Sequence, residues 1–178
     1  MGQRFSPGDV IDGFELLERL PSGGMASIWK ARKPDIDGLV VLKIPFLDPG
    51  RDVSVIVGYE VEEMIARHLS GKHVPRFHAF GDLRSVPYIA MEFLEGTSVA
   101  NLIKNAPLSF EEVTRIGIET GVALAALHEQ KVAHLDLKPE NIYMLERGAV
   151  LLDFGLAHHM ELPDLLSEQS NVPMGTAA

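Results

Sequence analysis

The first part of the chain alternates short apolar runs with polar turns. Apolar side chains recur over residues 14–20, again over 28–31, and as a compact run over 39–44. Asp37-Gly38 is typical of a hairpin between the last two runs. Residues 21–27 are too polar and glycine-rich for the interior of a strand or helix. We therefore predict three strands between residues 14 and 44, connected by turns.

The next segment has a helical pattern. Apolar positions at Val57, Val61, Ile65 and Leu69 are four residues apart, which predicts one amphipathic helix over residues 54–69. Residues 88–94 form an apolar run typical of a buried strand, and Glu95-Gly96 after it predicts a turn. We place a domain boundary at this turn.

The second half is predicted to contain two helices and two strands. A short helix is expected over 97–105, and the residues Ser109 to Glu112 form a capping box that opens a longer helix ending near Glu129. Residues 141–145 and 149–152 have strand character and flank a turn at Arg147-Gly148. Residues 158–178 lack a period and predict a loop.

Composition limits the classes of function. The 178 residues are 46% hydrophobic and 23% charged, which is ordinary for a folded protein of one domain or two small lobes. A net charge of -9 would repel a phosphate backbone, so nucleic acid is not an expected partner. The chain has no cysteine, which excludes a disulfide framework and fits a reducing cytoplasm. It has no apolar run long enough to span a membrane, so we expect no membrane contact and a cytoplasmic location.

The densest chemistry lies in residues 134–141, which read HLDLKPEN and hold an imidazole, a carboxylate, an ammonium and a carboxamide. The glycine-rich turn, a lysine in a strand and a glutamate in a helix precede it, and Asp153-Phe154-Gly155 follows it. In this order and spacing the five elements resemble the signature of the protein kinases, specifically the bacterial eukaryotic-like serine/threonine protein kinases. The resemblance covers residues 14 to 178.

The resemblance implies an α+β, two-lobed protein kinase-like fold. Residues 1–13 would be an N-terminal extension, 14–94 a β-rich N-lobe with one helix and the hinge, and 95–178 an incomplete α-rich C-lobe through the activation loop. ATP and Mg²⁺ are the implied cofactors, bound between the lobes. The chain ends where the family's substrate-binding segment begins, so we expect a fragment of a longer protein with part of the 109–129 helix left exposed.

The catalytic roles follow from the chemistry of phosphoryl transfer, which needs positioning, charge neutralisation and an acceptor for the hydroxyl proton. By resemblance Asp136 is the base and Lys138 neutralises charge on the transferred group. Asn141 and Asp153 supply oxygen ligands to Mg²⁺. Lys43 would pair with the phosphates and with a helix glutamate, for which the spacing favours Glu62 over the alternatives, Glu60 and Glu63. His134 and Phe154 are expected to be structural.

The resemblance also assigns nucleotide-binding positions. The glycine-rich turn would cradle the phosphates, Met91 would be the gatekeeper, and the backbones of Glu92 and Leu94 and the ring of Tyr143 would contact the base. The full set of nucleotide-binding residues is Leu20, Pro21, Ser22, Gly23, Gly24, Met25, Ala26, Ile28, Lys43, Met91, Glu92, Leu94 and Tyr143.

Four positions depart from the family pattern. Pro21 and Ala26 replace the first and third glycines of the loop, which should stiffen it. Leu42 is expected where the family has an alanine over the adenine. Leu135 replaces the arginine that in many family members binds a phosphate on the activation loop, so phosphorylation of Ser167, Ser170 or Thr176 should not be obligatory for activity.

The sequence thus predicts an ATP-dependent kinase of protein Ser/Thr hydroxyls. A nucleotide-binding pseudokinase or scaffold is the first alternative, and a small-molecule kinase of the aminoglycoside or choline type is the second. A zinc protease is excluded because position 132 is not histidine, and neither glycine-rich segment forms a Walker A loop. The substrate and the oligomeric state do not follow from the sequence.

Overall fold

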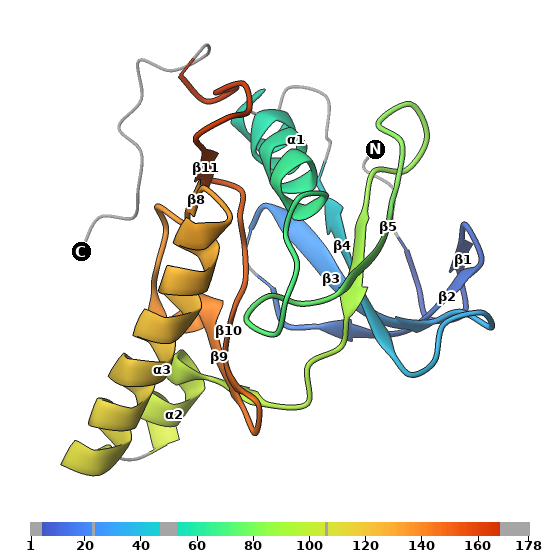
Figure 1. Cartoon of the computed structure of the whole chain (residues 1–178). Helices are drawn as coiled ribbons and strands as arrows, with labels where there is room; N and C mark the ends of the chain where they lie inside the picture. The colour runs from blue at the N-terminus through green and yellow to red at the C-terminus, as the bar shows by residue number, and fades with distance from the viewer. Residues whose placement is uncertain (1–4, 23, 47–52, 106, 168–178) are drawn as a thin grey trace. The chain divides into compact units, whose positions relative to one another are not determined.

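A computed structural model describes residues 5–22, 24–46, 53–105 and 107–167 (Figure 1). It forms two compact units, Met1–Tyr59 with Arg76–Phe93, and Glu60–Pro75 with Leu94–Ala178. The change of unit at Phe93 lies one residue before the boundary expected from the sequence. Residues 60–75, expected in the first lobe, group instead with the second unit.

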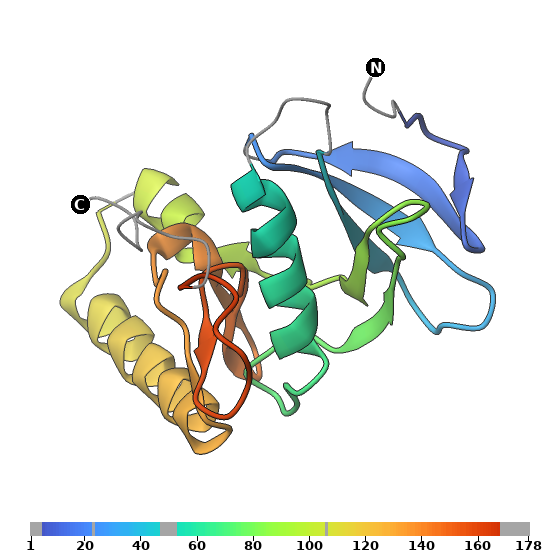
Figure 2. The ribbon, with the colours of Figure 1, turned by 90° about the horizontal axis from the view of Figure 1, so that it is seen from above.

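The first unit is built on one antiparallel sheet of six strands, in the order β1-β2-β3-β4-β6-β5 (Figure 2). The strands are β1 (Val10–Ile11), β2 (Phe14–Leu20), β3 (Ala26–Arg32), β4 (Val40–Pro45), β5 (Phe77–Phe80) and β6 (Ile89–Glu92). Strands β2, β3, β4 and β6 correspond to the predicted runs, and Gly38, with φ +87°, lies in the turn between β3 and β4.

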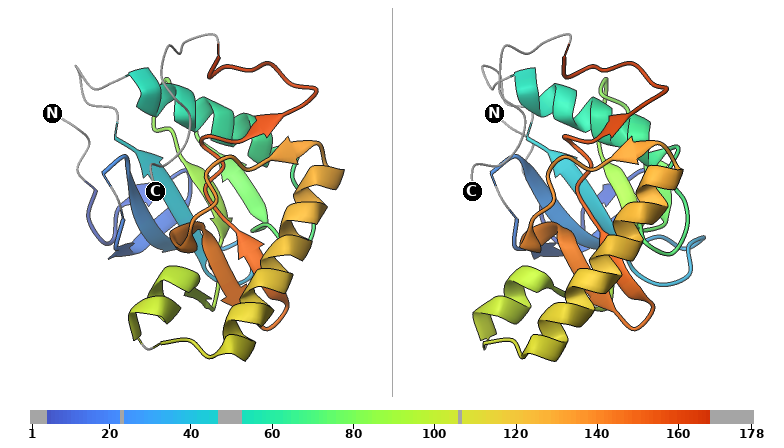
Figure 3. Two further views of the ribbon diagram at one scale, coloured as in Figure 1. Left: turned by 90° about the vertical axis from the view of Figure 1, so that its left-hand side faces the viewer. Right: turned by 60° about the vertical axis from the view of Figure 1, so that its left-hand side comes forward.

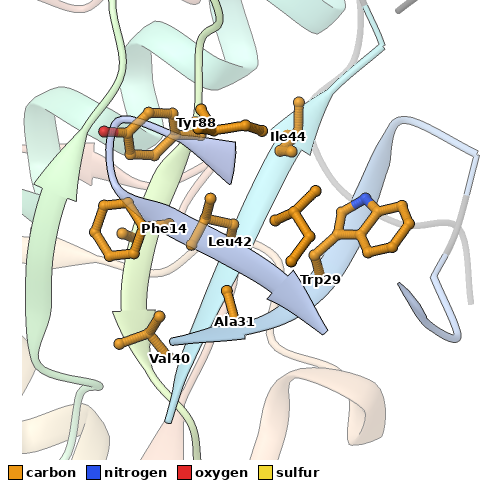
Figure 4. Packing of buried hydrophobic residues seen from close by; sticks show 10 residues of the cluster. Phe14, Trp29, Ala31, Val40, Leu42, Ile44 and Tyr88 are labelled. Atoms are coloured by element: carbon orange, nitrogen blue, oxygen red, sulfur yellow. The ribbon is translucent and has the colours of Figure 1, made fainter. Parts of the chain in front are cut away.

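One face of this sheet carries the hydrophobic core (Figure 4). Val40, Leu42 and Ile44 alternate along β4 and are at most 4% exposed, together with Trp29 from β3 and Phe14 from β2. Side chains of a strand point alternately to its two faces, so the residues between them, Lys43 among them, lie on the opposite face. The alternation therefore fixes which β4 side chains can contact a ligand.

Two residues before β2, Val10 and Ile11, belong to the sheet. We expected residues 1–13 to be an extension, but Val10 and Ile11 form β1, which pairs with β2, and Ile11 is 5% exposed. The Tyr88 hydroxyl donates to Asp12 Oδ2 over 2.9 Å, which ties the β1–β2 turn to the core. A strand of two residues has too little periodicity to be recognised in a sequence.

Helix α1 (Val53–Ala66) matches the predicted amphipathic helix. Val57, Val61 and Ile65 are buried at the expected spacing of four residues. The helix ends three residues before the expected Leu69, which is itself buried beyond the helix end.

The second unit is built on two helices and two small sheets. Its elements are β7 (Thr97–Ser98), α2 (Val99–Asn105), α3 (Phe110–Glu129), β8 (Val132–Ala133), the 3-10 turn η1 (Pro139–Asn141), β9 (Ile142–Leu145), β10 (Gly148–Leu151) and β11 (His158–His159). The sheets have the orders β10-β9-β7 and β11-β8. Gly96 lies in the connection before β7, where a Cβ atom would be 2.6 Å from the Met144 carbonyl oxygen, so only glycine allows this approach.

Helix α3 begins with the predicted capping box: the Ser109 hydroxyl accepts from the Glu112 N–H, and the Glu112 carboxylate accepts from the Ser109 N–H. The helix packs against β8 and β10 (Figure 3), burying Thr120, Ala123 and Leu127. These contacts place β8, and the loop that follows it, at a fixed position in the second unit.

Another face of α3 is exposed, as expected. Phe110 is 85% exposed, Ile118 64% and Val122 51%. Among the described residues, no helix has the length and apolar character needed to cross a membrane.

The segment after residue 157 begins with a short strand that was not expected. We predicted a loop over 158–178, but His158 and His159 form β11, which pairs with β8. Residues 160–167 form turns and irregular backbone with no helix or strand, and residues 168–178 lie outside the described residues.

Candidate active site

Two of the expected catalytic side chains and one expected metal ligand lie together in the loop between β8 and β9. Lys138 Nζ is 2.5 Å from Asp136 Oδ2, and Asn141 Nδ2 donates to the Asp136 carbonyl over 3.0 Å. Asp136 is 8% and Asn141 6% exposed. The loop therefore holds the carboxylate, the ammonium and the carboxamide in one cluster, with the carboxylate oriented by the other two.

The backbone before Asp136 is strained. Leu135 has φ +58°, and the Asp136 N–H donates to the His134 carbonyl over 2.9 Å, closing a three-residue turn. A leucine in the left-handed region costs roughly 1–3 kcal/mol, and such strain often occurs at functional sites. The Leu135 side chain is 49% exposed, so its burial does not account for this conformation.

His134 fastens this loop to the segment that contains Asp153. Its Nε2 donates to the Leu152 carbonyl over 3.0 Å, so Nδ1 carries the lone pair and faces the Asp136 N–H at 3.4 Å. The ring lies 5.3 Å from that of Phe154, which is 1% exposed. Burial lowers the pKa of His134. His134 and Phe154 thus have the structural role expected of them, with His134 neutral.

Asn141 and Asp153 have the donor atoms that a magnesium ion prefers. Because Asn141 Nδ2 donates to Asp136, its side-chain oxygen is left to accept a ligand, and it has no hydrogen-bond donor among the described residues. A backbone hydrogen bond holds the segments of Asn141 and Asp153 together: the Leu152 N–H donates to the Asn141 carbonyl over 2.9 Å. Asp153 has φ +65°.

Two protein oxygens alone would be a poor site for most metals. The described part of the chain holds no group of three or more His, Cys, Asp and Glu residues placed to bind a metal ion. Mg²⁺ differs in that it keeps several waters and is usually held by one or two protein oxygens plus substrate phosphates. The donor set therefore fits magnesium brought in with a nucleotide.

The three glutamates of α1 differ in their surroundings. Glu62 is 4% exposed, whereas Glu60 and Glu63 are only half-buried. Glu63 accepts from Arg67 Nη2 over 2.7 Å, one turn further along the helix. A buried carboxylate needs a cationic or hydrogen-bonding partner, so the burial of Glu62 agrees with the choice made from the spacing.

Lys43 lies in β4 and is half-buried on the sheet face opposite the core. Its strand neighbour Leu42 was expected above the adenine, and the structure shows that this was wrong. Leu42 is 0% exposed within the core on the other face. Val41, two residues before Lys43 in β4, is the residue that shares the lysine's face, because side chains of a strand alternate with a period of two.

The glycine-rich segment connects β2 to β3. Leu20 and Ile28 are paired across the two strands, so the expected phosphate loop is a hairpin between them. Pro21, Ser22, Gly24 and Met25 are exposed, whereas Ala26 is 8% exposed within β3. Gly23, the expected central glycine, lies outside the described residues.

The expected hinge, residues 91–94, begins in β6 and continues beyond its end. Met91, the proposed gatekeeper, is 9% exposed and packs with Tyr59 and Ile89. The Glu92 N–H donates to the Arg76 carbonyl over 2.8 Å, so in this arrangement it does not donate to a nucleotide base.

Leu94 and Tyr143 belong to the second unit. The Leu94 N–H has no acceptor among the described residues and could donate to a base. Tyr143 lies half-buried in β9, paired with Val150 of β10 and Ser98 of β7.

Comparisons with known proteins agree with the resemblance. The family model described as "Protein kinase domain" matches residues 14–176. The probable serine/threonine-protein kinase CPE1738 of Clostridium perfringens is 31% identical over 166 residues, covering 92% of this chain and 24% of the relative. Serine/threonine-protein kinase PknF of Mycobacterium tuberculosis is 29% identical over 179 residues, covering 96% of this chain and 37% of the relative.

Solved structures show the same fold. The kinase domain of PknI from Mycobacterium tuberculosis aligns with a TM-score of 0.70 at 24% sequence identity, covering 85% of this chain and 62% of that domain. The chain therefore spans a quarter to just over a third of the length of the two curated relatives.

Proposed function

Since this chain belongs to the protein kinase domain family, we propose that it carries the phosphoryl-transfer site of a serine/threonine protein kinase. In this site the γ-phosphoryl group of MgATP passes to a Ser or Thr hydroxyl of a protein substrate. The cluster of Asp136, Lys138 and Asn141 is the observation that carries the proposal.

Each member of the cluster has a separate task. The Asp136 carboxylate would accept the proton of the attacking hydroxyl, and its orientation by Asn141 Nδ2 and Lys138 Nζ keeps it in one place. Lys138 would shift its positive charge toward the transferred phosphoryl group as negative charge builds on it. Because little covalent chemistry is required of the protein, this positioning and neutralisation account for most of the expected catalysis.

ATP and Mg²⁺ would be held by the residues already described. Bound Mg²⁺ would neutralise part of the negative charge of the nucleotide phosphates. Asn141 and Asp153 would hold the metal, and Lys43 would hold the nucleotide phosphates, with Glu62 as the anionic partner of its ammonium. The turn after β2, in which Ser22, Gly24 and Met25 are exposed, would cover the phosphates with backbone N–H groups.

A pseudokinase or scaffold is the second candidate. The replacements of glycine by Pro21 and Ala26 favour it, since they reduce the approach of the loop backbone to phosphates. The retention of Lys43, Asp136, Asn141 and Asp153 favours the enzyme, because binding alone does not need a base next to a magnesium ligand.

Transfer of label from the γ-phosphate of ATP to protein substrates, followed by identification of the phosphorylated amino acid, tests the proposal. We expect phosphoserine and phosphothreonine, with transfer that requires Mg²⁺. MgATP binding without any transfer would support the scaffold instead. Transfer to small alcohols but not to proteins would indicate a small-molecule kinase.

A further inference from the structure

Two adjacent histidines anchor the segment that follows Asp153-Phe154-Gly155. His158 and His159 form β11, which pairs with Ala133 and Val132 of β8 (Figure 3). His159 is 9% exposed, and its ring lies 5.8 Å from that of His68, just beyond the end of α1. All of these residues belong to the second unit.

The hydrogen bonds define the protonation state in which His159 is held. The Glu161 N–H donates to His159 Nδ1 over 3.1 Å, so this nitrogen must carry a lone pair. His68 Nδ1 lies 2.8 Å from the Met64 carbonyl, which can only accept, so His68 carries its proton on this nitrogen. The observed arrangement thus requires neutral His159. A proton on Nδ1 would remove the acceptor of the Glu161 N–H and place a buried cation beside His68.

The contacts of His158 differ from those of His159. Its Nδ1 is 3.8 Å from Asp164 Oδ2, and the Asp164 carboxylate also accepts from the Ser167 N–H over 3.1 Å. The backbone hydrogen bond from Ser167 is the main cause that lowers the pKa of Asp164, which keeps the carboxylate ionised. A proton on His158 therefore strengthens its contact with Asp164, whereas a proton on His159 Nδ1 breaks the hydrogen bond from the Glu161 N–H.

The other charged groups around β11 come from three elements. At the end of α1, Arg67 is hydrogen-bonded to Glu63. In the turn before β8, Lys131 is exposed, and its carbonyl accepts the Met160 N–H over 2.9 Å. The β11 segment itself contributes the carboxylate of Glu161. The titratable ring that packs on His159 is therefore that of His68, whose own side chain is exposed, and among the described residues His159 has no hydrogen bond or ion pair to a carboxylate.

We infer that His159, packed on His68, is a proton-responsive anchor of residues 158–167. In its neutral form it holds the start of this segment on β8 through the Glu161 N–H. On protonation it releases the segment, while His158 and Asp164 keep the turn over residues 158–167 closed on itself. This would give the chain a means of controlling the segment that does not use an arginine at position 135.

Amide hydrogen exchange of the 178-residue chain, measured by NMR and divided by the intrinsic exchange rate at each pH, tests this inference without depending on phosphoryl transfer. We expect the protection of the Met160 and Glu161 amides to fall by up to about tenfold for each unit by which the pH is lowered from 7.5 to 5.5, because one proton is linked to release. The Leu151 amide, which donates to the His73 carbonyl over 2.9 Å in the same unit, is the internal reference and should not change.

Three variants separate the contribution of His159 from that of His68 and provide a control. His159→Asn places an acceptor near the position of Nδ1 but does not titrate, so its Met160 and Glu161 protection should be independent of pH. His68→Asn keeps the donor to the Met64 carbonyl and removes one cation, so the protection should fall at lower pH than in the parent. The exposed His128 at the end of α3 supplies the matched control, His128→Asn, which should behave as the parent does.

Two results would overturn the inference. One is protection of Met160 and Glu161 in the parent that does not vary between pH 7.5 and 5.5. The other is an unchanged pH dependence in His159→Asn. If His159→Asn also lowers the protection of Leu151, the substitution has perturbed the whole second unit. The test then rests on His68→Asn, and an unchanged pH dependence of Met160 and Glu161 protection in that variant overturns the inference.

Discussion

The ammonium of Lys138 lies 2.5 Å from Oδ2 of Asp136, two residues earlier in the same loop. The lysine is thus the direct charge partner of the proposed base and is 32% exposed, so it can turn toward a ligand. Replacing it by methionine keeps most of the volume but removes the charge. We expect Lys138→Met to lower kcat by about a hundredfold, as for loss of one charge-stabilising group, with a smaller change in the KM for ATP. Steady-state kinetics measure this, with Lys131→Met as the exposed control; equal losses in both variants would contradict it.

Glycine at position 135 should relieve the strain in the backbone. Leu135 has φ +58° and is 49% exposed, so Leu135→Gly removes strain and little burial. We expect the free energy of unfolding to rise by about 0.5–1 kcal/mol, because the strain that is relieved exceeds the entropic cost of ordering a glycine. Urea denaturation measures it.

Leu137 provides the matched control for this change. It is 42% exposed but is not among the residues with positive φ. Leu137→Gly should therefore lower the free energy of unfolding by about 0.5–1 kcal/mol. Destabilisation of similar size in both variants would show that the conformation of Leu135 is not strained.

Phosphorylation of the segment after Asp153 should not be obligatory for activity. Ser167 Oγ donates to the Asp164 carbonyl over 3.1 Å, and a phosphate there would lie close to the Asp164 carboxylate. Ser170 and Thr176 lie outside the described residues. We expect the Ser167→Ala, Ser170→Ala, Thr176→Ala triple variant to keep label transfer within about threefold of the parent, since position 135 offers no arginine to a phosphate. A loss of a hundredfold that a phosphate restores would contradict the expectation.

Much of the fold followed from the sequence because its elements are long and regular. The capping box at Ser109 and the four-residue spacing of Val57, Val61 and Ile65 are local signals, and the structure confirms the helices that they predict. The strands β1 and β11 were missed because two residues have no measurable period, and their pairing partners determine them.

The candidate site was predicted less completely. The cluster of Asp136, Lys138 and Asn141 could be expected because all three lie in one loop. The assignment of Leu42 to the adenine site was wrong, because the alternation of side chains along β4 places Leu42 in the core. The positive φ of Leu135 could not be predicted, since leucine has no preference for that region and the surrounding contacts of His134 and Asp136 impose it.

Acid should weaken the fold through His134. Burial lowers its pKa in the folded state, so the unfolded chain binds the proton more tightly. The stabilisation is complete above the unfolded value of about 6.5 and is lost as the pH falls from there through the folded pKa. We expect the free energy of unfolding to decrease between pH 7 and pH 5, and to decrease less in His134→Gln, which keeps a donor for the Leu152 carbonyl. Urea titrations at each pH measure the difference. The control is His128→Gln, and identical slopes in all three proteins would contradict the prediction.

The role of Asp136 as the base is the central claim, and label transfer by Asp136→Asn tests it most directly. Asparagine keeps the size of the side chain and an oxygen for Lys138 but cannot take up a proton. We predict that transfer from MgATP to protein substrate falls by about 10²–10⁴-fold, the contribution of a general base, while MgATP binding and the folded state are retained. Asp82→Asn, in an exposed turn of the first unit, is the matched control and should transfer at the parent's rate. Transfer by Asp136→Asn at a rate close to that of Asp82→Asn would contradict the account.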